Sequence, residues 1–206
     1  VGWGDLLDTA PAYGLSEQRL GELLTSSARQ DWVIVSKAGE KFTDGESSFD
    51  FSEQHITQSV EGSLQRLKTD YLDALLIHSD GNDLARIEQD QVFETLVKLK
   101  QRGLIRAYGM STKTVAGGLA TVEQADIAMV TYNPVMTEEV AVIDAALQQG
   151  KGILVKKAFA SGHIDTIPGQ DPINAAVDFV LSHPGVSSLI SGTINPEHLK
   201  HNLSVV

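Results

Sequence analysis

The most constraining feature of this sequence is a regular alternation of short apolar runs with longer segments that carry apolar residues at helical spacing. The strand-like runs are Asp5–Ala10, Trp32–Lys37, Leu72–His78, Ile105–Ser111, Ile127–Tyr132, Gly152–Lys157 and Ser187–Ser191. The helical patterns are Ser16–Leu24, Ser52–Leu67, Asp83–Gln101, Thr114–Val122, Glu138–Gln149, Pro172–Ser182 and Pro196–Val206. Such alternation predicts one α/β domain, in which helices cover a parallel sheet.

Two architectures fit this alternation, a doubly wound open sheet and a (β/α)8 TIM barrel. No Gly-x-Gly-x-x-Gly follows any strand-like run, so the nucleotide-binding signature of the open sheet is absent. Polar residues end nearly every run, which favours the barrel. Seven units are one short of eight, so we expect the first β/α unit to lie upstream of Val1. The domain of residues 1–206 is then an N-terminally incomplete barrel.

Composition narrows the class of protein. With 206 residues, 42% of them hydrophobic, the chain can form one large core. The formal net charge of −11 argues against a nucleic-acid partner. No apolar run is long enough to span a membrane, and no secretion signal is visible. The absence of cysteine excludes disulfides and thiolate zinc sites, and it fits a cytoplasmic protein.

Four polar residues, Asp8, Tyr13, Lys37 and His78, lie at or just past the ends of strand-like runs. In a barrel the carboxyl ends of the strands form the active face, so these side chains would converge. A carboxylate, a phenol, an amine and an imidazole together can deliver a proton to a carbonyl oxygen. Each residue alone is more often a cap, a solvated group or a packing residue. It is their combination that favours a catalytic interpretation.

The segment 8–17, Asp-Thr-Ala-Pro-Ala-Tyr-Gly-Leu-Ser-Glu, followed by Leu20-Gly21, resembles the signature of the aldo-keto reductases. Further matches in family order are Val35–Lys37, Arg66–Leu67, Asp70–Asp73, Ile77–His78, Gly103–Arg106, Gly109–Ser111, Tyr132–Pro134, Gly192–Thr193, His198–Leu199 and Asn202. The resemblance covers essentially the whole chain. It implies a (β/α)8 barrel that reduces a small aldehyde or ketone with NADPH and without a metal.

The resemblance also assigns roles to the four polar residues. Tyr13 would be the proton donor, and Lys37 would stabilise its phenolate, since a phenol is a weak acid at neutral pH. Asp8 would pair with Lys37 and keep it charged. His78 would donate a hydrogen bond to the substrate carbonyl and orient it. The nicotinamide would supply the hydride, because no side chain can.

Three positions depart from the family pattern where it holds the nicotinamide. Ser111 is followed by Thr112 instead of asparagine, Met129 stands in place of glutamine, and Lys156 stands where a stacking tyrosine is common. Met129 by itself is best interpreted as a filler of the barrel interior. Lys156 could bind a substrate anion or a cofactor phosphate, or form a Schiff base.

The phosphate end of the cofactor site is also partly altered. Gly192, Thr193 and Ile194 precede the last helix and could offer backbone N–H groups to a phosphate. His198 stands where the family often has a cation for the 2′-phosphate of NADPH, so NADH is an alternative cofactor. Asn202 is suited to contact the adenine.

Two other functions stay open. One is a nucleotide-binding regulatory protein on the same barrel with little turnover. The other is a Schiff-base lyase that uses Lys156 or Lys37. The segments Gly39–Phe51 and Ala158–Asp171 are interpreted as long loops at the active face. Trp3 and Phe42 are candidates for an apolar substrate wall. The sequence indicates neither the substrate nor the oligomeric state.

Overall fold

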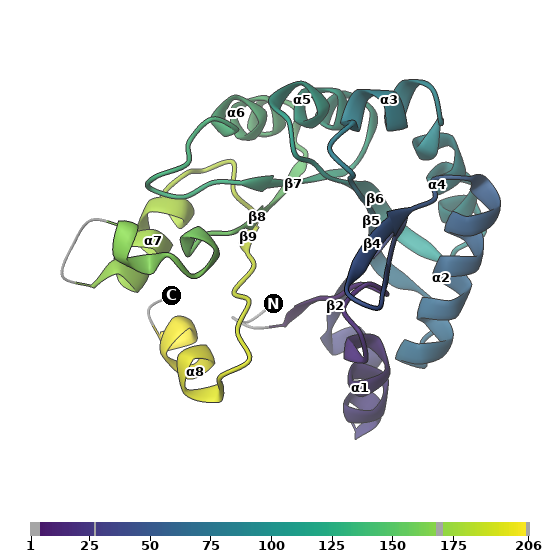
Figure 1. The fold of residues 1–206 in the computed structure, drawn as a ribbon, viewed down its shortest axis with the longest axis horizontal. Helices are drawn as coiled ribbons and strands as arrows, with labels where there is room; N and C mark the ends of the chain where they lie inside the picture. Colours follow the sequence, from purple (N-terminus) through teal and green to yellow (C-terminus); the bar gives the residue numbers. More distant parts are fainter. Residues whose placement is uncertain (1–4, 27, 168–170, 205–206) are drawn as a thin grey trace.

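A computed structural model describes residues 5–26, 28–167 and 171–204. Its main sheet is parallel and seven-stranded, and it curls with the helices outside, as Figure 1 shows. The strands in spatial order are β1 (Leu6–Asp8), β2 (Val33–Ala38), β5 (Leu72–His78), β6 (Ile105–Ser111), β7 (Ile127–Thr131), β8 (Gly152–Lys156) and β9 (Ser188–Leu189). Within the described ranges, β1 pairs only with β2 and β9 only with β8. The fold class expected from the alternation is confirmed.

The helices follow the strands in the expected order. They are α1 (Ser16–Leu23), α2 (Glu53–Leu67), α3 (Asp83–Glu88), α4 (Val92–Gln101), α5 (Val115–Gln124), α6 (Val140–Gln149), α7 (Pro172–Leu181) and α8 (Pro196–Ser204), with short 3-10 turns at Leu24–Ser26, Arg29–Asp31, Ala160–Gly162 and Ile164–Thr166. The single helix expected over Asp83–Gln101 is wrong. It is interrupted before Val92, because Gln91 adopts a left-handed backbone with φ of 52°. No helix within these ranges has the length and apolar character needed to cross a membrane.

The segment Gly39–Phe51 is not the long loop that was expected. It forms an antiparallel hairpin of β3 (Glu40–Thr43) and β4 (Glu46–Phe49). The turn is Asp44-Gly45, with φ values of 53° and 86°. Asp-Gly between two short strands is a strong hairpin signal, because both residues tolerate positive φ. In Figure 1 this hairpin projects from the inner side of the ring, near the carboxyl ends of β2 and β5.

Alternation along the strands separates the interior of the barrel from its outer core. Ile34, Leu75 and Ile77 belong to the outer core that packs against α2 and α4. The interior cluster contains Val35, Ala74, Leu76, Met129 and Leu154. Side chains alternate between the two faces of a strand. The last residues of β2 and β5 whose side chains face the interior are therefore Lys37 and His78. By the same alternation, the last inward-facing residues of β6, β7 and β8 are Ser111, Thr131 and Lys156.

A close helix contact explains one motif residue of the sequence. Gly21 on α1 lies so near α2 that a Cβ atom there would sit 2.0 Å from the carbonyl oxygen of Arg66. Next to this contact, the buried carboxylate of Glu17 accepts hydrogen bonds from Ser36 at 2.6 Å and from Arg66 at 2.8 Å. These contacts fix α1, and with it the loop that carries Tyr13, against the barrel.

Candidate active site

A cavity of about 1760 Å³ occupies the centre of the curled sheet, at the carboxyl ends of the strands. Asp8, Tyr13, Lys37 and His78 all line it. Typical small-molecule pockets are about 300–1000 Å³. The cavity is larger because it continues along the edges of β1 and β9, past Leu7 and Leu189.

Asp8 and Lys37 form a buried ion pair at one side of this cavity. The Nζ atom of Lys37 lies 2.7 Å from both carboxylate oxygens of Asp8 and donates a further hydrogen bond to the carbonyl of Thr9 at 3.1 Å. The β1–β2 register, which pairs Asp8 with Val35, brings the two residues together. Burial raises the pKa of the Asp8 carboxyl, and the ammonium of Lys37 opposes that rise. Lys37 therefore has its charge neutralised and its position fixed.

Tyr13 presents its phenol at the mouth of the cavity. The β1–α1 loop turns back at this point, where the amide of Tyr13 donates to the carbonyl of Ala10 and Gly14 adopts a φ of 59°. The Nζ atom of Lys37 lies 4.8 Å from the centre of the tyrosine ring. Tyr13 as a whole is 46% exposed and lines the cavity, so a molecule in the cavity can contact it.

His78 completes this group from the end of β5. Its ring meets that of Tyr13 edge to face, with 6.0 Å between ring centres. Its Nδ1 atom lies 2.6 Å from a carboxylate oxygen of Glu40 on the hairpin. Burial lowers the pKa of His78 to about 4; Glu40 opposes this, while the charges of Lys37, Lys156 and Lys113 add to it. The imidazole is therefore neutral at physiological pH.

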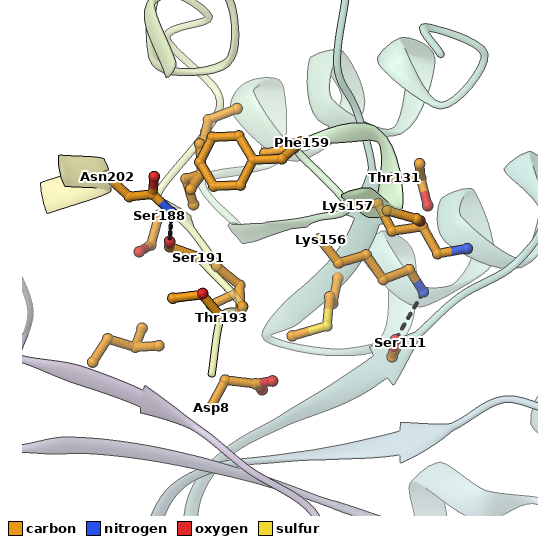
Figure 2. A pocket seen from close by; sticks show the side chains of 18 of the residues that line it. Asp8, Ser111, Thr131, Lys156, Lys157, Phe159, Ser188, Ser191, Thr193 and Asn202 are labelled. Carbon is orange, nitrogen blue, oxygen red and sulfur yellow. Dashed lines mark hydrogen bonds between the residues drawn. The ribbon is translucent and has the colours of Figure 1, made fainter. Parts of the chain in front are cut away.

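Lys156 extends from the end of β8 toward Ser111 at the end of β6, as Figure 2 shows. Its Nζ atom donates to the hydroxyl of Ser111 at 2.8 Å and to the carbonyl of Thr112 at 2.6 Å. Burial lowers the pKa of Lys156 to about 8, against the attraction of Glu139. This ammonium is therefore held among strand ends and is easier to deprotonate than an ordinary lysine.

Two of the predicted nicotinamide contacts are directed into the protein. The hydroxyl of Thr112 is buried, and its one proton is shared between the carbonyl of Met129 at 3.4 Å and the carboxylate of Glu139 at 3.3 Å. Met129 is 2% exposed within the interior cluster, as its interpretation as a filler requires. Glu139 also accepts from the amide of Thr131 at 2.7 Å, and burial raises its pKa. The remaining polar groups that line the cavity here, Ser111 and Lys156, are hydrogen-bonded to each other.

The third side of the cavity is formed by the segment from β9 to α8. Ser188, Ser191 and Thr193 line the cavity there (Figure 2), together with Gly192 and Ile194. Asn202 on α8 is buried and donates to the hydroxyl of Ser191 at 3.0 Å, whereas its Oδ1 atom has no hydrogen-bond partner among the described residues. A buried, unpaired acceptor indicates a place for a donor from a ligand.

The structure thus brings together most of the predicted site. The four proposed catalytic residues and eight of the proposed cofactor contacts line the cavity: Ser111, Thr112, Met129, Lys156, Gly192, Thr193, Ile194 and Asn202. His198 does not line it and is exposed on α8. Phe42 is 53% exposed on the hairpin and also lies outside the lining, and Trp3 lies outside the described residues.

Two acidic residues of the site were missed. Glu139 follows the strand end at β7 but was counted only as part of a helix. Glu40 was assigned to a loop without structure. The Asp44-Gly45 turn signal could have identified the hairpin that carries Glu40.

Comparison with known proteins gives a consistent result. The family model described as the aldo/keto reductase family matches residues 4–168. The protein PA4992 of Pseudomonas aeruginosa, solved as an aldo-keto reductase, is 53% identical, with a TM-score of 0.90 over 98% of this chain and 76% of that one. The aldo-keto reductase AKR11C1 of Bacillus halodurans shares the fold, with a TM-score of 0.84 at 24% identity, over 98% of this chain and 76% of that one.

Curated relatives are more distant. The oxidoreductase YqkF of Bacillus subtilis is 26% identical over 238 residues, which cover 96% of this chain and 76% of that protein. A D-threo-aldose 1-dehydrogenase from a Pseudomonas species is 29% identical over 185 residues, which cover 75% of this chain and 55% of the enzyme. The family match, the fold and the cavity residues agree, and the chain belongs to the aldo-keto reductase family of NAD(P)H-dependent oxidoreductases.

Proposed function

We propose that this protein reduces an aldehyde or ketone to an alcohol, with Tyr13 as the proton donor. The observation that carries the proposal is the convergence of Tyr13, Lys37 and His78 on one side of the central cavity. A nucleotide bound in this cavity would supply the hydride. The protein's own task is then to hold the carbonyl oxygen and to protonate it.

Each residue of the group has a separate part in that task. Tyr13 carries the acidic proton and is open to the cavity. Lys37 lies under the phenol ring and stabilises the negative charge that forms when the proton leaves. Asp8 is a positioning residue, because its carboxylate holds Lys37 by two contacts of 2.7 Å. General-acid catalysis of this kind contributes about 10²–10⁴-fold to a rate.

The residues of the third side support a nicotinamide adenine dinucleotide as the hydride source. The unpaired Oδ1 atom of Asn202 suits the exocyclic amine of an adenine. The backbone of Gly192, Thr193 and Ile194 would bind phosphate, and Ser111 with Lys156 would contact the carboxamide of the nicotinamide. His198 is available at the surface for the additional phosphate of NADPH, and we propose NADPH with NADH as the alternative.

One observation favours a second candidate function. The pKa of Lys156 is lowered to about 8, and lysines with lowered pKa values are the ones that form Schiff bases with carbonyl compounds. In this case Lys156 would attack the carbonyl carbon and water would leave. Borohydride would reduce the resulting imine and fix the ligand to Lys156, which peptide mass spectrometry detects.

The primary test is a spectrophotometric assay of NADPH and NADH oxidation over a panel of aldehydes and ketones. Tyr13→Phe removes the acidic proton and should reduce turnover by about 10³-fold, in line with the loss of a general acid. A matched control is Tyr71→Phe, because Tyr71 lies between the guanidinium groups of Arg29 and Arg106, away from the cavity. Full turnover by the Tyr13 variant would contradict the assignment.

A further inference from the structure

Lys156 is a half-buried ammonium group in the cavity that lacks a counter-ion. Its Nζ atom donates to the hydroxyl of Ser111 and to the carbonyl of Thr112, so two of its three N–H groups are used. Both partners are neutral, and Lys156 forms no ion pair among the described residues, whereas Lys37 in the same cavity is paired with Asp8. A charge withdrawn from water is costly unless it is paired. The surroundings of Lys156 therefore leave a place for a negative charge.

The next residue, Lys157, adds a second ammonium group on the same side. Consecutive residues of an extended strand point to opposite faces, but Lys157 follows β8 with a left-handed φ of 57°. Its carbonyl accepts hydrogen bonds from the buried side chain of Asn133 at 2.8 Å and from the amide of Ala160 at 2.9 Å, which hold this turn. Figure 2 shows that the side chains of Lys156 and Lys157 extend in the same direction. Residues other than glycine in this conformation cluster at functional sites.

A third ammonium group comes from Lys113, which follows β6. Its amide donates to the buried carboxylate of Asp83 at 3.0 Å, so its backbone is held in place. Its Nζ atom lies 5.9 Å from the centre of the Phe49 ring on the hairpin. Burial lowers the pKa of Lys156 most, and the charges of Lys157 and Lys113 lower it further. The three ammonium groups, which all line the cavity, therefore lie within electrostatic reach of one another.

The carboxylates that line the cavity do not neutralise this cluster. They are those of Asp5, Asp8, Glu138 and Glu139. Asp8 is already paired with Lys37, and Glu139 attracts Lys156 without forming an ion pair with it. Within the described ranges, Asp5 and Glu138 form no ion pair with any of the three lysines. In a chain with a formal net charge of −11, this is a local excess of positive charge, and it concentrates anions in the cavity.

We propose that Lys156, Lys157 and Lys113 bind an anionic group, and that this group is the carboxylate of an oxo acid, the substrate. In naming the substrate, the inference rests on the proposed function. Burial lowers the pKa of His78, and the charges of Lys156 and Lys113 lower it further. The cluster therefore acts on the part of the cavity where Tyr13 and His78 meet. A carboxylate bound to the lysines leaves the carbonyl of the same molecule within reach of Tyr13.

Two other groups could approach the same lysines. The carboxamide of a nicotinamide can accept the remaining N–H of Lys156, but it is neutral and leaves the positive charge of the cluster in place. A phosphate of the nucleotide has the same charge chemistry as a carboxylate, although the backbone of residues 192–194 is available for phosphate at the third side of the cavity. The test must therefore separate a substrate carboxylate from a nucleotide phosphate.

The direct test is isothermal titration calorimetry with pyruvate and levulinate, each compared with its neutral methyl ester. No reduced nucleotide is present, so nothing is converted. The titrations are made without nucleotide and with saturating NADP⁺. With NADP⁺ bound, at least one acid should bind about 10- to 100-fold more tightly than its ester, the effect of a hydrogen bond to a charged group.

The other outcomes each overturn a different part of the inference. Equal affinities of acid and ester in both conditions would mean that the lysines are no anion site. An advantage of the acids that disappears when NADP⁺ is added would mean that the lysines bind a phosphate of the nucleotide instead. If NADP⁺ does not bind at all, the proposed function fails, and the nucleotide-free titrations still decide the anion site.

Matched variants sharpen this test. Lys156→Gln and Lys157→Gln each remove one charge while keeping a polar side chain, and each should lower the ratio of acid to ester affinity by about 10-fold. Lys98→Gln is the control, because Lys98 is paired with Glu53 at 2.7 Å on the outer helices and does not line the cavity. Circular dichroism verifies that the variants fold. An unchanged ratio in both cavity variants would contradict the site.

Turnover with NADPH tests the substrate class itself. The ratio of the kcat/KM values of acid and ester should favour the acid in the unaltered protein and fall by about 10-fold in Lys157→Gln. The same ratio in both proteins would overturn the substrate class. Absence of turnover with any of these compounds would count against the proposed function, whereas the titrations would still decide the anion site.

Discussion

The two sides of the cavity differ in how their polar groups are satisfied. On the side of β1 and β2, the ion pair of Lys37 and Asp8 is complete within the protein. On the side of α8, Asn202 keeps a buried acceptor without a partner. Groups that must hold a fixed charge during a reaction need internal partners. Groups that bind an exchangeable ligand must keep a hydrogen-bond donor or acceptor without a partner until the ligand binds. The difference suggests proton transfer at the first side and nucleotide binding at the second.

The largest expected effect comes from breaking the ion pair. Lys37→Met leaves the carboxylate of Asp8 buried without its cation, which should lower the free energy of unfolding by about 3–5 kcal/mol. Turnover should fall as well, because the phenol of Tyr13 loses the ammonium near its ring. Urea unfolding and the NADPH oxidation assay measure the two effects. The double variant Asp8→Asn/Lys37→Met should recover stability but not turnover, and recovery of both would refute the catalytic role of Lys37.

A smaller effect is expected at the opposite side. Asn202→Leu removes the unpaired acceptor, so nucleotide affinity should fall by about 10-fold, the worth of one buried hydrogen bond. The free energy of unfolding should change little, because the unpaired buried Oδ1 is removed while the hydrogen bond from Nδ2 to Ser191 is lost. Isothermal titration with NADPH and thermal unfolding test this pair of outcomes. Unchanged affinity would remove Asn202 from the nucleotide site.

A third expected effect is a pH dependence of stability at Lys156. Its pKa is about 8 in the folded protein, below the ordinary 10.5 of the unfolded chain, so the unfolded state binds more protons between these values. Stability should therefore rise with pH from about 8 to about 10.5 through this group. Lys156→Met should show a flatter slope of unfolding free energy in that window. Equal slopes would mean that Lys156 is an ordinary lysine.

Much of the fold could be predicted from the sequence, because successive residues of each strand alternate between the inner and the outer face of the sheet. In β2 and β5, apolar residues of alternate position fill two different cores, and the alternation places Lys37 and His78 inside the barrel. The helix expected over Asp83–Gln101 was wrong at one point, since periodicity does not report a single left-handed residue such as Gln91. The hairpin was missed because its exposed strands have no buried face.

The candidate site was predictable where a residue acts from a strand end, and less so where it depends on packing between distant segments. Glu40 meets His78 only because the hairpin folds over β5, and no local pattern encodes that contact. Similarly, the sequence could not indicate that the hydroxyl of Thr112 would be used by Met129 and Glu139. Such contacts depend on tertiary structure, and at Thr112 they change the expected chemistry.

The division of work between the two sides is tested most directly by the rate of NADPH oxidation as a function of NADPH concentration, in Tyr13→Phe and Asn202→Leu. At a saturating carbonyl substrate, we expect Tyr13→Phe to lower the maximal rate while half-saturation stays at the same NADPH concentration. Asn202→Leu should keep the maximal rate and raise the half-saturating concentration about 10-fold. If both variants lose rate and affinity together, the two sides do not act separately and the account is wrong.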